Sequence, residues 1–172
     1  MSDAQTWRVP VTHNMYVITD TDADEPDDSR PGNGLVRVND DHTQATILTG
    51  TTWGHLDATV DIRTGPPTAE EEDWDDIVEA SLHFEGDGPL LGSLITEDLQ
   101  PLDLTPAGHP DQWWRFRFHA RGRDEAAAAG DQPTQDDGTP IEQHLIQIWP
   151  GPKTTERQIK TTDATGADYR AP

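Results

Sequence analysis

The sequence predicts an all-β protein, an antiparallel β-sandwich or flattened barrel of about eight or nine short strands with at most one or two short helices. Three observations support this prediction. Apolar residues recur at every second position in many short segments, turn-forming residues separate those segments, and helical spacing is nearly absent. Such strands bury one face and expose the other, which a sandwich or a barrel satisfies. No fixed repeat period appears, and this disfavours propellers and solenoids.

The segments with strand character follow one another along the whole chain. In order they are residues 7–18, 34–39, 45–51, 55–63, 77–84, 90–95, 102–105, 113–123, 142–149 and, more weakly, 157–160. Strict alternation is clear in 55–63, where Leu56, Ala58, Val60 and Ile62 share one face. Polar residues occupy the other face, as expected for a half-buried strand.

Residues 113–123 show the strongest alternation in the chain. Trp114 and the two phenylalanines that follow it at every second position are expected to face the core. The opposite face carries Trp113, Arg115, Arg117, His119 and Arg121. Opposite charges on neighbouring strands stabilise a sheet. We therefore expect these arginines to neutralise acids on the strands that contain Glu79 or Glu142.

Helical character is confined to two short stretches. Pro66 and Pro67 interrupt the chain, Thr68 can serve as an N-cap, and Glu71 stands three residues later as in a capping box. This pattern predicts one or two helical turns up to Trp74. The alanine-rich stretch 125–129 can add one further turn.

Length and composition indicate one domain with a small core. The chain has 172 residues, and its hydrophobic content of 32% is low for a globular protein. We expect a β-sandwich domain over residues 1–152. A flexible insert, rich in Ala, Gly, Asp and Gln, is expected at about 124–140, and a weakly ordered tail over 153–172.

Charge and composition exclude several classes of function. The chain carries 33 Asp and Glu against 12 Lys and Arg, a net charge of −21, so direct binding to nucleic acid is not expected. No apolar run is long enough to cross a membrane. The absence of cysteine removes disulfides and thiolate chemistry, and no signal peptide is apparent, so a cytoplasmic location is expected.

No pattern of catalytic or cofactor-binding residues is present. The sequence has no nucleophile elbow, no phosphate-binding glycine loop and no zinc-type histidine spacing. The alternating acids from Asp20 to Asp24 resemble the start of a calcium loop, but Glu25 and Pro31 occupy the positions where an EF-hand needs Gly and Glu. We therefore predict a non-enzymatic protein with no cofactor and no metal.

Two dense clusters of acids are the candidate partner-binding residues. The first cluster comprises Asp20, Asp22, Asp24, Glu25, Asp27 and Asp28, and the second comprises Glu70, Glu71, Glu72, Asp73, Asp75 and Asp76. Clustered carboxylates attract a basic surface over a long range and compete with phosphate for it. The same acidity is also typical of a GC-rich or salt-adapted genome, and the sequence leaves both explanations open.

Four segments carry a resemblance to known families: residues 74–81, 102–108, 114–124 and 142–150. Over about 74–150 they resemble an uncharacterised actinobacterial family. The order of elements, with its Leu-x-Leu-x-Pro-x-Gly turn at 102–108, more distantly resembles the competence protein J family. Those proteins are small acidic inhibitors of a DNA-entry nuclease. The chain departs from that pattern in its acidic loop, its insert near 124–140 and its tail.

Two hypotheses of function follow. The first is a non-enzymatic acidic binding protein, an inhibitor or immunity-type partner of a basic protein such as a nuclease, present as a monomer or weak dimer. The alternative is a β-sandwich that binds a small molecule or carbohydrate. Its open face would carry Trp113, Arg115, Arg117, His119 and Arg121. Trp53, in a turn close to glycine, is a further contact candidate.

Overall fold

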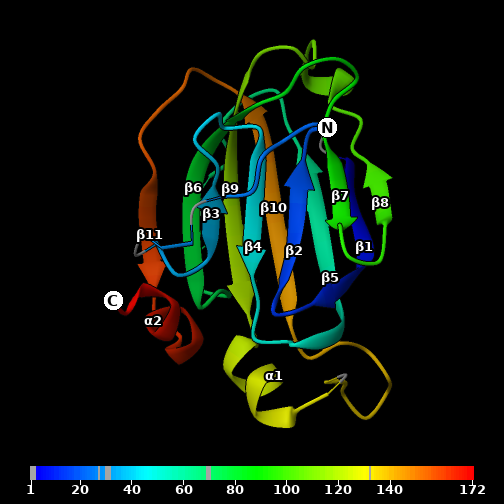
Figure 1. Cartoon of the computed structure of the whole chain (residues 1–172). Coiled ribbons are helices and arrows are strands. Elements are labelled where there is room, and N and C mark those ends of the chain that lie inside the picture. The colour runs from blue at the N-terminus through cyan, green and yellow to red at the C-terminus, as the bar shows by residue number, and fades with distance from the viewer. Residues whose placement is uncertain (1–2, 27, 30–31, 69–70, 132) are drawn as a thin grey trace.

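The computed structural model describes residues 3–26, 28–29, 32–68, 71–131 and 133–172. A single curled sheet of eleven strands forms a half-barrel (Figure 1). Its strands are β1 (Asp3–Thr12), β2 (Met15–Thr19), β3 (Val36–Val38), β4 (Gln44–Leu48), β5 (Trp53–Ile62), β6 (Asp76–His83), β7 (Leu90–Ser93), β8 (Asp98–Pro101), β9 (Trp113–Arg121), β10 (Gln143–Pro150) and β11 (Arg157–Thr161). The mostly-β prediction is confirmed.

The sheet is mixed, which corrects the prediction of a plainly antiparallel sandwich. Hydrogen-bonded neighbours follow the order β11-β6-β9-β10-β5-β1-β2-β4-β3, and β7 and β8 extend from β2. The pair β5 and β10 is parallel, with Asp57 opposite Gln143, whereas the other described pairs are antiparallel. Parallel strands need a long return connection. Here the connection from β5 to β10 contains β6 to β9 and α1, and it ends with the segment between β9 and β10.

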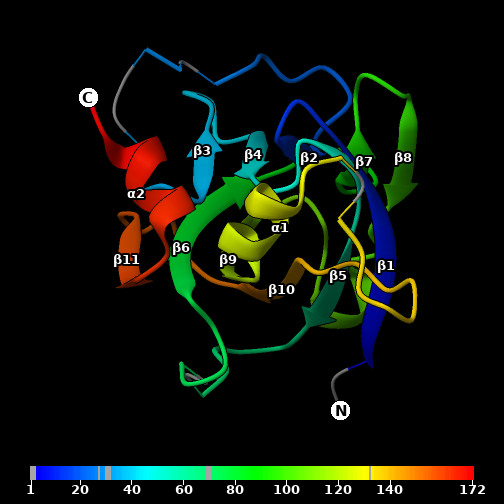
Figure 2. The ribbon, with the colours of Figure 1, turned by 90° about the horizontal axis from the view of Figure 1, so that it is seen from below.

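Two short α-helices lie at the edges of the sheet. Helix α1 (Arg123–Ala129) lies below the lower end of the half-barrel, and helix α2 (Ala164–Arg170) lies beside β11 and β3 (Figures 1 and 2). The helical turn expected at 125–129 is therefore present. Of the helix expected from Thr68 to Trp74, residues 69–70 lie outside the described part, and Glu71–Trp74 forms a turn.

The long first strand of the prediction is two strands. β1 and β2 are joined by His13 and Asn14, whose φ angles are 53° and 61°. Two successive positive φ values are typical of the tight hairpin turn that matches strand twist, and Asn tolerates this conformation. The Asn14 side-chain amide also donates to the Gly50 carbonyl (3.3 Å) and the Thr52 hydroxyl (3.2 Å). These contacts fix the turn, which the sequence pattern alone did not reveal.

Two further boundaries differ from the prediction. The strand expected at 102–105 is displaced: β8 ends at Pro101, and a 3-10 helix, η1 (Thr105–Ala107), follows. The tail expected to be weakly ordered instead contains β11 and α2. Tertiary contacts account for this, since β11 pairs with β6 and the N-cap of α2 is buried.

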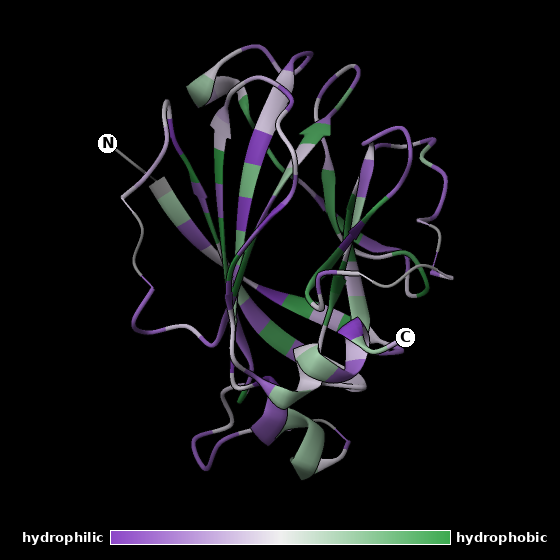
Figure 3. Ribbon diagram, turned by 90° about the vertical axis from the view of Figure 1, so that its left-hand side faces the viewer, coloured by the Kyte–Doolittle hydropathy of each residue, from purple (hydrophilic) through white to green (hydrophobic). Residues whose placement is uncertain are grey.

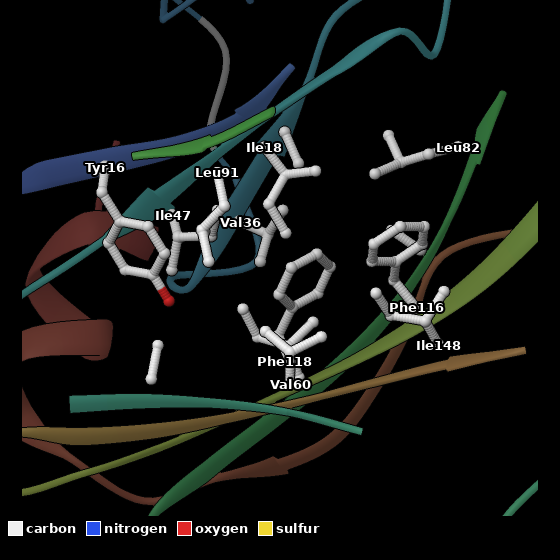
Figure 4. Packing of buried hydrophobic residues seen from close by; sticks show 14 of the residues in the cluster. Tyr16, Ile18, Val36, Ile47, Val60, Leu82, Leu91, Phe116, Phe118 and Ile148 are labelled. Atoms are coloured by element: carbon white, nitrogen blue, oxygen red, sulfur yellow. The ribbon is translucent and has the colours of Figure 1, made fainter. Parts of the chain in front are cut away.

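The core lies between the two sides of the curled sheet. Hydrophobic and hydrophilic bands alternate along the strands in Figure 3, as the period-two pattern requires. Figure 4 shows Tyr16, Ile18 and Leu91 on one side of the core facing Phe116 and Phe118 on the other. The aromatic face predicted for 113–123 is therefore buried, and Trp114 is fully enclosed.

The half-barrel has an open seam between β3 and β6, closed at one end by a buried ion network. The Arg123 side chain is fully buried and donates to Asp163 Oδ2 (2.6 Å), Asp163 Oδ1 (2.7 Å) and Asp76 Oδ2 (2.8 Å). It also donates to the carbonyls of Gly34 (2.8 Å) and Leu48 (3.3 Å). One guanidinium therefore joins β6, α1, the start of α2 and the strands β3 and β4.

The other end of the seam is held by the turn between β3 and β4. The His42 ring nitrogen Nδ1 donates to the Ser81 carbonyl (2.9 Å), and the His83 amide donates to the His42 carbonyl (2.8 Å). The seam is thus closed by side-chain and turn contacts rather than by a strand ladder.

Replacement of Arg123 tests the importance of the buried network. Arg123→Ala leaves the Asp163 carboxylate buried without its partner, and breaking a buried pair costs about 3–5 kcal/mol. We expect the free energy of unfolding, measured by urea titration with tryptophan fluorescence, to fall by that amount. The control Arg121→Ala removes an exposed arginine two residues away and should cost about 1 kcal/mol or less. Equal losses in both variants would contradict this role of Arg123.

Candidate protein-binding surface

The first acidic cluster lies in the loop between β2 and β3. Its exposed members take part in no ion pair among the described residues; they are Asp22, Asp24, Glu25 and Asp28. Asp20 differs, because it is half-buried and its carboxylate accepts from the amides of Thr21 (2.8 Å) and Glu85 (2.8 Å). Asp27 lies outside the described residues. The cluster therefore presents four exposed carboxylates that form no ion pair with the described residues, on a loop that Asp20 anchors. We call this segment, residues 20–28, the acidic loop.

Backbone contacts hold the acidic loop against the sheet. The Asn39 side-chain amide donates to the Asp24 carbonyl (2.9 Å), and the Asp20 amide donates to the Thr43 carbonyl (2.9 Å). At the far end, the Asn33 side chain accepts from the amides of Leu35 and Val36. These bonds satisfy the backbone without using the exposed carboxylates, which stay available to solvent and to a partner.

The second acidic cluster divides into exposed and structural members. Glu71, Glu72 and Asp73 are exposed, and Glu70 lies outside the described residues. Asp76, in contrast, is fully buried and pairs with Arg123. The prediction that Asp76 lies on a partner-binding surface is therefore wrong. The residue belongs to strand β6 and neutralises the buried Arg123.

Asp75 and Asp76 share a role in joining segments. The Asp75 carboxylate accepts from the Gly122 amide (3.2 Å), and Asp76 Oδ1 accepts from the Thr162 amide (2.7 Å). Arg170 Nη1 also donates to Asp76 Oδ2 (3.1 Å). The two acids at the start of β6 therefore act as acceptors inside the fold.

The two acidic clusters lie on opposite sides of the molecule. In Figure 2 the acidic loop crosses the side formed by β3, β4 and β2, whereas the segment between β5 and β6 extends from the opposite side. A single flat partner cannot contact both. The acids that the sequence placed in one candidate surface thus form two separate surfaces.

The face proposed for a small molecule or carbohydrate is covered, which corrects the alternative hypothesis. Arg115, Arg117 and His119 are all buried. Arg115 donates to the backbone carbonyls of Thr154 (2.9 Å) and Thr155 (2.9 Å), so the segment before β11 lies over it. This face cannot accept a ligand because the chain itself covers it.

The remaining two residues of that face also have partners within the chain. Trp113 is half-buried, with the rings of His42 and His83 beside it and the Lys153 ammonium 5.3 Å from its ring centre. Arg121 is exposed, stacks over Trp74 and donates to the Gln143 side chain. Trp113 and Arg121 line two separate surface hollows of about 400 and 330 Å³, and neither hollow is lined by the buried Arg115, Arg117 or His119.

The cross-strand role predicted for the arginines is confirmed for Glu79. Its carboxylate accepts from Arg115 Nε (3.2 Å) and Arg117 Nε (2.9 Å). Arg117 also donates to the Pro67 carbonyl (3.3 Å) and stacks over Trp149. Glu79 neutralises one of the two guanidinium charges, and both arginine side chains are buried, so neither is exposed to a ligand.

His119 is buried beside Trp74 and is held neutral there. Its Nδ1 donates to the Leu145 carbonyl (3.0 Å), its ring packs against Trp74, and its Nε2 has no partner among the described residues. Burial, with a smaller contribution from the Arg117 charge, lowers the pKa of His119 to about 4. A second ring proton would have no acceptor there.

A second group of polar residues lies inside the half-barrel. The Glu142 carboxylate accepts from His144 Nε2 (2.8 Å), and His144 Nδ1 accepts from the Tyr16 hydroxyl (2.8 Å). Burial raises the pKa of Tyr16 well above its usual value. Burial would also raise that of Glu142, but hydrogen bonds from His144 and Thr51 lower its pKa. All members of the chain from Tyr16 to Glu142 are buried, so it stabilises the core and is not exposed to a substrate.

No metal-binding geometry is present in the part of the chain that the structure describes. No group of three or more His, Asp or Glu residues there could hold a metal ion. No helix among the described residues is long and apolar enough to span a membrane.

An apolar groove beside the acidic loop was not predicted. It has a volume of about 320 Å³ and is bounded by the acidic loop, by His13 and by the turn between β7 and β8. That turn presents Leu94 and Ile95, whose exposed fractions are 43% and 58%. Trp53, 42% exposed, packs on the His13 ring at 4.4 Å.

The exposed apolar residues could be found only in part from the sequence. Trp53 was a contact candidate because its turn is close to glycine. Leu94 and Ile95 were assigned to a strand, although Thr96-Glu97-Asp98 follows them directly and indicates a turn. Leu94 and Ile95 directly before a turn were the signal in the sequence that indicated an exposed apolar patch at the tip of a hairpin.

The neutral state of His119 makes stability depend on pH in a defined window. Because the pKa is about 4 in the folded chain and near 6.5 when unfolded, the unfolded state binds more protons between these values. Stability from this group is complete above pH 6.5 and is lost as the pH falls toward 4. Between pH 7 and 5 we expect a loss of about 2 kcal/mol from His119.

The variant His119→Gln isolates this contribution. The free energy of unfolding is measured by urea titration at pH 7 and at pH 5. Between these two pH values it should fall by about 2 kcal/mol less in the variant than in the parent chain. The exposed His55 provides the matched control, since His55→Gln should leave the pH dependence unchanged. A pH dependence that is the same in all three proteins would refute the assignment of a neutral His119.

Comparison with known proteins identifies the fold. No family model and no curated protein matches the chain. Two solved structures match it along most of their length. The crystal structure of ComJ, inhibitor of the DNA-degrading activity of NucA, from Bacillus subtilis superposes with a TM-score of 0.60 at 12% identity, over 88% of this chain and 99% of that one. The protein described as crocagin biosynthetic gene J superposes with a TM-score of 0.50 at 14% identity, over 88% and 99%.

These similarities concern the fold. The distant resemblance to the competence protein J family expected from the order of elements is confirmed, because the ComJ fold spans nearly the whole of both chains. At 12% identity the superposition establishes a shared architecture of the curled sheet and not a shared set of surface residues.

Proposed function

We propose that this chain is a non-enzymatic acidic protein that binds and inhibits a basic protein, such as a nuclease. The observation that carries the proposal is the acidic loop, whose exposed carboxylates form no ion pair with the described part of the chain. Carboxylates that the fold does not use for its own stability are available to neutralise cations on a partner. We assign the partner contact to the acidic loop rather than to the exposed acids at 71–73.

Electrostatics explains why such a surface suits an inhibitor. A net charge of −21 accelerates the approach of a basic partner, and a cluster of carboxylates orients it. A nuclease holds phosphate with lysines and arginines, so an anionic loop can compete with DNA for the same groups. No catalytic group is needed for this task. The burial of Tyr16, His144 and Glu142 is consistent with that.

The structural neighbour supports the same class of function. ComJ is described as the inhibitor of the DNA-degrading activity of NucA, and it shares the curled sheet. The fold is therefore able to serve as the frame of a nuclease inhibitor. What a partner recognises, in contrast, depends on the loops, and the acidic loop is the departure from the family pattern that we expect to define the partner.

Titration into DNA-degradation assays tests the proposal. The chain is added to NucA and to basic nucleases from its own organism, with plasmid DNA as substrate. We expect saturable inhibition of at least one nuclease, with half-inhibition at a concentration that rises about tenfold between roughly 50 and 300 mM NaCl. Inhibition that ignores salt, or no inhibition and no binding across the panel, would contradict the proposal.

A pair of charge-matched variants tests the assignment to the acidic loop. The triple change Asp22→Asn, Asp24→Asn and Glu25→Gln removes three exposed charges from the loop. The control Glu71→Gln, Glu72→Gln and Asp73→Asn removes three from the opposite side. Because screening weakens distant charges, the loop variant should inhibit at least about tenfold more weakly and the control about as well as the parent. Equal effects would assign the binding to overall charge.

A further inference from the structure

The groove beside the acidic loop combines two features that rarely occur together on a strongly acidic surface. Its apolar part consists of Met15 and Val17 of β2 together with Leu94 and Ile95 of the β7–β8 turn. Its polar rim includes the carboxylates of Glu25 and Asp28 from the acidic loop. Water-exposed leucine and isoleucine side chains contribute nothing to the core, and an exposed apolar patch with a polar rim is typical of an interaction site.

We infer that this groove docks a segment of the basic partner in which apolar side chains stand between lysines or arginines. The inference rests on the proposed function and names the place where the partner binds. Apolar side chains of the segment would contact Leu94 and Ile95, while its cations would pair with Glu25 and Asp28. The acids alone would attract any cation; the apolar floor adds selectivity for a segment of mixed character.

The charges around the groove favour a cationic occupant. Glu25 and Asp28 line it, and Asp22 and Asp24 stand on the same loop. Among the described residues, Arg37 of β3 is the Lys or Arg that lines the groove. The two lining carboxylates, with two more on the same loop, outnumber this guanidinium in the described part of the chain, so lysines or arginines on either side of the apolar residues would be stabilised.

The chain itself is a poor occupant of the groove. Two copies would each bring a net charge of −21, and like charges would meet across the contact. The apolar surface also continues beyond the groove, because His13 lines the groove and Trp53 packs on His13. An exposed tryptophan beside a groove is a frequent anchor for a protein segment.

Three labelled peptides of about ten residues serve as probes for the groove. One alternates Lys with Leu, one replaces the lysines by Ser, and one replaces the leucines by Ser. Binding is followed by fluorescence anisotropy at near-physiological salt. We expect the Lys-Leu peptide to bind at least about tenfold more tightly than either of the others, because only it uses both the rim and the floor.

Three variants locate that binding. Leu94→Ser with Ile95→Ser removes the apolar floor, and Glu25→Gln with Asp28→Asn removes the rim charges. The control, Glu71→Gln with Glu72→Gln, removes two charges from the opposite side. All six residues are exposed, so the folded state should persist, which circular dichroism verifies. We expect both groove variants to bind the Lys-Leu peptide about tenfold more weakly and the control to bind within about twofold of the parent.

The outcomes separate the docking site from the function. Peptide binding that is insensitive to both groove variants, or equally weakened in the control, overturns the docking inference. So does a concentration-dependent dimer, seen by sedimentation, that Leu94→Ser with Ile95→Ser abolishes, because the groove would then hold a second copy. If a nuclease is inhibited equally by the parent and the groove variants, the function stands and the docking site is refuted. If no nuclease is inhibited, the function fails while the peptides still decide the docking site.

Discussion

The buried Arg123 side chain is the interaction on which the rest of the structure depends. The curled sheet stops short of closure: its last strands are β11 and β3, and β3 contacts β6, the strand next to β11, without a ladder between them. Arg123 supplies donors to carboxylates on one side of this seam and to carbonyls on the other. A fully desolvated guanidinium is tolerated only when such acceptors surround it. The seam and the arginine therefore require each other.

The same network also fixes the segment that enters β3. The Gly34 carbonyl that Arg123 binds lies next to Asn33, whose side chain caps the start of β3. Arg170 of α2 donates to the Asn33 carbonyl (3.2 Å) as well. The end of the loop connection is thereby fixed from both helices.

The acids of this chain divide between structure and surface. Asp76, Glu79, Glu142 and Asp163 are buried and accept hydrogen bonds from arginines, a histidine or backbone amides. These buried acids use up much of the positive charge of a chain that has only 12 Lys and Arg. Among the described residues, the exposed acids of the acidic loop and of 71–73 form no ion pair, whereas Asp57 pairs with Arg8 and Asp111 lies 3.2 Å from His83. The strongly negative surface is therefore partly a consequence of how the core is built, and the binding role that we propose depends on where the exposed carboxylates gather.

Local patterns in the sequence determined the mostly-β class, the buried aromatic face of β9 and the pairing of its arginines with Glu79, because strand periodicity and cross-strand charge are properties of neighbouring residues. The positions of Asp76, Arg123 and the β7–β8 turn depended on contacts between segments that are distant in the chain. The acid at position 76 has the same local surroundings as its exposed neighbours, yet Arg123 lies 47 positions further on. Likewise, the apolar groove arises only where the acidic loop folds against Leu94 and Ile95. Periodicity assigns a residue to a face of a strand, whereas the tertiary structure alone decides which other segment covers that face.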